Sequence, residues 1–136
     1  MVHSSLQAFA ERLRTKGRIG KQDVALLQRV LLPDGIMSRH EAEFLVALDR
    51  EIAGAHAAWS AYLIGSLVDY AVWGARPTGT IDRETGAWLA ALLTGAGSSP
   101  LAGRILAEIV READRVDAAL LAHLPPVGPA STALAA

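Results

Sequence analysis

Three stretches of the chain align without gaps, and each has the layout of a turn followed by the start of a helix. They are GRIGKQDVALL (17–27), GIMSRHEAEFL (35–45) and GTIDRETGAWL (79–89). Each begins with a glycine, which tolerates the positive φ that often follows a helix or turn. Three residues later stands a residue suited to an N-cap, and a large apolar residue followed by leucine then begins a buried stripe. The repeat therefore predicts a helix start, with its preceding turn, at three places in the chain.

The remaining positions of the repeat have physical roles as well. A lone apolar residue in each turn, Ile19, Met37 or Ile81, is expected to anchor that turn to the core. Ser38 and Glu41 have the spacing of a capping box, in which the glutamate reaches back to the backbone N–H of the cap. The copies are unequally spaced along the chain, so they do not predict a solenoid array.

Composition supports a helical fold, because alanine and leucine dominate the apolar half of the 136 residues and both favour helices. The predicted helices run over about 5–16, 21–32, 39–53, 57–73, 83–93 and 100–123. We therefore expect an all-α, single-domain bundle of about six helices over residues 1–123. Residues 124–136 form a Pro/Ala-rich tail that is expected to be disordered. The three tryptophans, Trp59, Trp73 and Trp88, lie in apolar stripes and are expected to be mostly buried.

Several classes of protein are disfavoured by the same composition. No apolar run reaches the roughly 18 residues that a membrane span needs, and the N-terminus lacks the layout of a signal peptide. The absence of cysteine excludes disulfides, thiolate zinc sites and cysteine nucleophiles. Basic residues gather in residues 1–30, but no aromatic residue is interleaved with them, so a nucleic-acid partner is not favoured. A cytoplasmic protein without a membrane span is expected.

The stretch from Asp34 to Glu41 also resembles half of a calcium-binding loop. With Gly35 at the sixth position of such a loop, Asp34, Ser38 and Glu41 fall at ligand positions five, nine and twelve. Positions one and three are Val30 and Leu32, which offer no side-chain oxygen. A capped helix start is therefore the favoured interpretation, and a divalent-cation site at these three residues is the alternative.

The repeated helix starts of the pattern (A/D)DGxIxxxEaxxL resemble those of the tellurite-resistance TerB-like domains. The segment HAAWSAYLIGSLVDYAVWGARPTGTIDRETGAWL (56–89) is also similar to uncharacterised alphaproteobacterial proteins built from such units. The resemblance covers about residues 15–95 and implies an all-helical domain whose helix starts carry acidic loops in metal-binding members. Carried over to this chain, it leaves Asp34 and Glu41 as the plausible acidic ligands.

Asp69 is the one carboxylate within the apolar helix predicted over 57–73. A lone carboxylate there is costly unless it is bonded, so we expect it to bind a neighbouring turn or an arginine such as Arg76 or Arg83. Three functions follow from the sequence. The leading one is a non-enzymatic interaction or scaffold module with an unknown protein partner, for which the TerB-like resemblance implies a role in stress physiology. The second is a divalent-cation-responsive module, and the third is a small enzyme that uses Asp69 in a pocket.

Overall fold

The computed structural model describes residues 4–52, 54–74, 77–94 and 100–124. Its α-helices are α1 (Ser4–Lys16), α2 (Lys21–Leu26), α3 (Arg39–Glu51), α4 (Ala57–Val68), α5 (Arg83–Leu93), α6 (Pro100–Glu112) and α7 (Ala118–Leu121). Two π-helical turns, η1 (Leu27–Leu31) and η2 (Asp69–Trp73), extend α2 and α4. Four two-residue strands complete the described structure: β1 (Arg18–Ile19), β2 (Gly54–Ala55), β3 (Thr80–Ile81) and β4 (Arg115–Val116). The expected all-α, single-domain bundle is confirmed.

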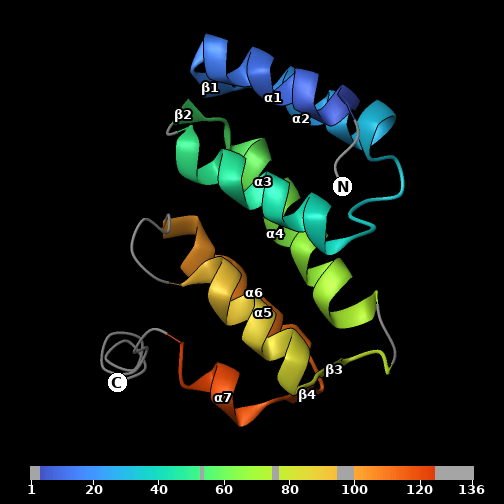
Figure 1. Ribbon diagram of the computed structural model, residues 1–136, viewed down its shortest axis with the longest axis vertical. Helices are drawn as coiled ribbons and strands as arrows, with labels where there is room; N and C mark the ends of the chain where they lie inside the picture. The colour runs from blue at the N-terminus through green and yellow to red at the C-terminus, as the bar shows by residue number, and fades with distance from the viewer. Residues whose placement is uncertain (1–3, 53, 75–76, 95–99, 125–136) are drawn as a thin grey trace.

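The helices are stacked along the long axis of the molecule (Figure 1). Helices α1 and α2 lie at one end, α3 and α4 in the middle, α5 and α6 beyond them, and α7 at the far end. Helix α4 is central and makes its most extensive contacts with α6. Within the described residues, no helix is long and apolar enough to cross a membrane.

The three repeated turns form as the sequence predicts. Gly17, Gly35 and Gly79 have φ values of 77°, 80° and 81°, and they are the positive-φ glycines among the described residues. Ser38 and Asp82 each accept a hydrogen bond from the backbone N–H three residues later, as N-caps do. The local signals for turn and helix start were therefore sufficient to place these segments.

The first and third turns are joined to a later segment by short parallel bridges. Strand β1 pairs with β2, and β3 pairs with β4. In the first bridge the His56 N–H donates to the Ile19 carbonyl oxygen at 2.8 Å, and in the second the Asp117 N–H donates to the Ile81 carbonyl oxygen at 2.9 Å. His56 and Asp117 then each cap the following helix through a side-chain atom. The chain therefore contains the same bridged arrangement twice.

The helix predicted over 100–123 is wrong, because the second bridge interrupts it. A single helix over 100–123 was expected, but α6 ends at Glu112 and the chain continues through β4 into α7. The Asp114 N–H donates to the Gly79 carbonyl oxygen at 2.7 Å instead of continuing the helix. Asp117 accepts a bond from the Ala119 N–H and begins a new helix. Of the expected tail, Leu124 is half-buried against the core, and 125–136 lie outside the described residues.

The core contains most of the predicted apolar stripes, with two corrections. Ile19 and Ile81 are buried, but Met37 is 69 % exposed and Ile36 is the residue that anchors the second turn. Trp59 is fully buried and Trp88 is half-buried, whereas Trp73 is 43 % exposed. The wider π-helical turn at η2 rotates the residues after Val68 away from a 3.6-residue stripe.

Helix α3 is tied to its neighbours by side-chain hydrogen bonds. The Trp59 indole N–H donates to Asp49 at 3.1 Å, and the Trp88 indole N–H donates to Glu43 at 2.9 Å. The Arg50 guanidinium donates to the Leu92 carbonyl oxygen near the end of α5 at 2.7 Å. These bonds position α4 and α5 against α3, and thereby place the turn before α3 opposite the end of α4.

Candidate binding groove

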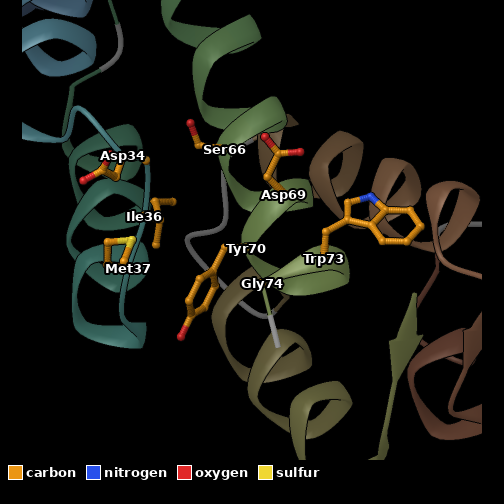
Figure 2. Close-up of a pocket in the computed structure, with 9 residues that line it drawn as sticks. Asp34, Ile36, Met37, Ser66, Asp69, Tyr70, Trp73 and Gly74 are labelled. Carbon is orange, nitrogen blue, oxygen red and sulfur yellow. The ribbon is translucent and has the colours of Figure 1, made fainter. Parts of the chain in front are cut away.

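A surface groove lies between the turn that precedes α3 and the helix formed by α4 and η2. The turn forms because Leu32 and Ile36 are buried on either side of Pro33, which cannot continue the preceding helix, and because Gly35 supplies a positive φ. The chain therefore reverses with Asp34 at its exposed apex. Figure 2 shows Ile36 and Met37 on one wall and Ser66, Asp69 and Tyr70 on the helix opposite.

The groove consists of two adjoining pockets of about 280 and 360 Å³. Both are lined by Gly35, Ser66 and Asp69, which mark where they meet. The first pocket is also lined by Ile36, Met37 and Tyr70, and the second by Gln28, Leu32, Pro33 and Tyr62. An elongated depression of this kind suits a side chain together with part of the backbone that carries it.

Asp69 lies in this groove and is exposed. No described residue forms a hydrogen bond or an ion pair with its carboxylate, and Arg83 instead lies at the start of α5 without reaching it. Arg76, the other expected partner, lies outside the described residues. The expectation that Asp69 ties its helix to a described turn is therefore wrong. The carboxylate avoids the cost of burial because it stands at the first position of η2, on the open side of the helix.

The Tyr62 side chain is 9 % exposed, and its hydroxyl has no hydrogen-bond partner among the described residues. Burial raises the pKa of this hydroxyl, and an interaction with the Ser66 side chain opposes part of that rise. A buried polar atom without a partner normally costs free energy, and such atoms are rare in native structures. Tyr62 lines the second pocket, but its hydroxyl oxygen is enclosed within the protein and is not itself part of the open surface.

The three residues of the predicted cation site have different roles. The Ser38 Oγ accepts a hydrogen bond from the Glu41 N–H at 3.2 Å. Glu41 Oε1 accepts from the Met37 N–H at 2.7 Å, one residue before the N–H that the capping-box pattern indicated. Asp34 lines the groove, whereas Ser38 and Glu41 do not. Across the described ranges, no group of three or more histidine, aspartate or glutamate side chains is placed to hold a metal ion.

The groove also bears on the enzymatic hypothesis for Asp69. A pocket does reach this carboxylate, and Ser66 lines the same pocket one helical turn earlier. No histidine or lysine is among the described residues that line either pocket, so Asp69 is the one carboxylate on the same helix as Ser66 in this lining that could serve as a general base. The sequence did not predict the groove, because its walls come from segments that are distant in the chain. The one local signal was Met37, an apolar residue in a polar turn.

The fold and the site define a small all-α domain with an acidic, partly apolar surface groove. No protein-family model, curated protein or solved structure matches the chain.

Proposed function

We propose that the chain is a non-enzymatic interaction module of the TerB-like type, and that it binds a protein partner through this groove. The observation that carries the proposal is the exposure of apolar side chains along it. Among the described residues, Met37 and Trp73 are two of the four large apolar side chains that remain exposed, and both line the first pocket. The Trp73 indole is directed away from Met37 (Figure 2) and lies beside Gly79, so the exposed apolar surface extends from the groove around the end of the helix, as is typical of a surface that another protein covers.

The nature of these side chains supports a protein partner. Methionine is flexible and polarizable, and it is frequent on surfaces that adapt to a bound chain. Tryptophan is enriched at the centres of protein interfaces. The helix starts on which the TerB-like resemblance rests have the expected glycine turns and caps, so the proposal keeps that type.

A photo-crosslinking residue placed at Met37 tests the proposal in an extract of the source organism. The matched control carries the same residue at Arg104, which is exposed on α6 and does not line the groove. Position 37 should give a discrete adduct that position 104 does not give. Excess unlabelled wild-type protein should abolish the adduct, and excess Met37→Glu protein should not. Identical adducts from both positions would refute the proposal.

A further inference from the structure

The charge of the groove points to the chemistry of its occupant. Asp34 and Asp69 are the charged residues that line the two pockets, and no lysine, arginine or histidine is among the lining residues that the structure describes. Neither carboxylate has a described partner. Most other described carboxylates are engaged: Asp23 with Lys16, Glu51 with Arg14, and Glu43 with the Trp88 indole. The groove therefore concentrates negative charge that no described residue of the protein compensates.

The walls of the groove complement a cation that is carried on an apolar stem. Asp69 lies at the junction of the two pockets, and Ile36, Met37 and Tyr70 line the pocket beside it (Figure 2). Lysine and arginine cover apolar surface with their methylene stems while the charged end binds a carboxylate. Tyr70 adds an aromatic ring to the lining of this pocket, and aromatic rings attract cations.

The second pocket offers a donor for the backbone that would carry such a side chain. Tyr62 and Ser66 both line it, one helical turn apart, but the Tyr62 hydroxyl oxygen is enclosed and interacts with Ser66. A peptide carbonyl oxygen is an acceptor that the Ser66 hydroxyl can satisfy. The apolar wall thus lies on one side of the Asp69 carboxylate and the second pocket on the other, an order that a protein segment can match.

We propose that the groove binds a partner protein segment that presents a lysine or arginine next to an apolar residue, with the cation on Asp69. This inference rests on the proposed function and specifies its partner. Asp34, at the rim, adds long-range attraction for a basic segment. The apolar residue of the segment packs against Ile36 and Met37, and binding weakens as salt screens the carboxylates.

Three labelled synthetic peptides test the inference by fluorescence anisotropy with the full-length protein. They share the same leucine positions and carry lysine, glutamine or glutamate at the intervening ones. The lysine peptide should bind about tenfold more tightly than the glutamine peptide, as expected for one charge-assisted contact, and the glutamate peptide should bind least. Amide NMR shifts on binding should fall in residues 34–37 and 62–73.

Matched variants locate the contact. Asp69→Asn should remove most of the preference for lysine over glutamine, and Asp34→Asn should reduce it less. Asp114→Asn removes an exposed carboxylate that does not line the groove, and it should leave the preference unchanged. All three variants should have the same Tm as the wild type, so that a loss of binding can be distinguished from a loss of folded protein.

Several outcomes would overturn the inference. They are equal or absent binding of the three peptides, a lysine preference that survives Asp69→Asn, and displacement of the lysine peptide by millimolar calcium at constant ionic strength, which would indicate a cation site. Failure of this inference is distinguishable from failure of the proposed function. If the adduct at Met37 persists while the lysine preference is absent, the groove binds a partner of other chemistry.

Discussion

Replacing glycine by alanine should destabilise the protein at three of its glycines and stabilise it at a fourth. Gly17, Gly35 and Gly79 lie in the left-handed region, with φ between 77° and 81°. Gly103 lies within α6, and a Cβ added there meets nothing within 4 Å. Replacing each glycine by alanine adds the same methyl group. Only the backbone conformation and the local space differ, so the changes in stability report on those two causes.

The magnitudes follow from the backbone. An alanine in the left-handed region costs roughly 1–2 kcal/mol, and the reduced freedom of the unfolded chain offsets about 0.4–1 kcal/mol of that cost. Gly17→Ala and Gly35→Ala meet open space, so each should lose about 1 kcal/mol. Gly103→Ala should instead gain about 0.5–1 kcal/mol, since alanine is the better helix former. The two groups should differ by about 1.5–2 kcal/mol.

Gly79→Ala should be the most destabilising of the four. A Cβ at this position would lie 2.6 Å from Asp114 Oδ2 and 3.4 Å from Trp73 Cζ3. The Asp114 carboxylate is the end of an exposed side chain and can rotate, so the additional loss should be modest. Asp114→Ala combined with Gly79→Ala should remove it, leaving the loss seen at Gly17. This comparison separates the steric part of the effect from the conformational part.

Urea denaturation followed by circular dichroism measures all of these differences. With a slope of about 1.5 kcal/mol per molar urea, the midpoints of Gly35→Ala and Gly103→Ala should lie about 1 M apart. The slope itself should not change. If Gly35→Ala were as stable as the wild type, or Gly103→Ala less stable than Gly35→Ala, the assignment of positive φ to the repeated glycines would be refuted.

Three further predictions concern single side chains. Ser38→Ala should lower the free energy of unfolding by about 1 kcal/mol because it removes the acceptor of the Glu41 N–H; a calcium-dependent rise in Tm that Glu41→Gln abolishes would favour the cation site instead. Burial alone would raise the pKa of Asp23, but hydrogen bonds, chiefly from Lys16, hold it below its ordinary value. This carboxylate therefore stabilises the fold at pH values above its unfolded pKa of about 4. That contribution is lost as the pH falls through the lower pKa of the folded state. The free energy of unfolding should therefore fall less steeply with acid in Asp23→Asn than in the wild type. Asp69→Ala should leave Tm unchanged in calorimetry, and a loss as large as that of Ser38→Ala would reveal a structural partner.

The features predicted correctly are those with local causes. A glycine, an N-cap and an apolar stripe all act within a few residues, so the repeated pattern was sufficient to place the turns at Gly17, Gly35 and Gly79 and the helices that follow them. The same holds for the stop before Pro33. No distant part of the chain is needed to satisfy these groups.

The errors have causes that act across the chain or alter the helical repeat. Trp73 belongs to the expected stripe only if the helix keeps 3.6 residues per turn, and the π-helical turn at η2 changes that phase. The break after Glu112 depends on the pairing of β4 with β3, which an amphipathic pattern does not report. The groove also depends on residues that are distant in the chain, because Asp34 and Asp69 line the same pocket only when the turn before α3 packs opposite η2.

In the second turn Ile36 is the buried anchor and Met37, which was expected to be buried, is exposed. This difference explains why the groove lies at the second turn. In the first and third turns the residue after the glycine, Arg18 or Thr80, pairs with a later strand, and the isoleucine that follows is directed inward. The second turn has no bridge to another described segment. The residue after its glycine, Ile36, is buried instead, and Met37 faces outward near Asp69, which has no partner among the described residues. Of the three copies of the sequence pattern, the first and third turns are therefore bridged to a later strand, and the second is not. The second turn is the one beside which the proposed partner segment would bind.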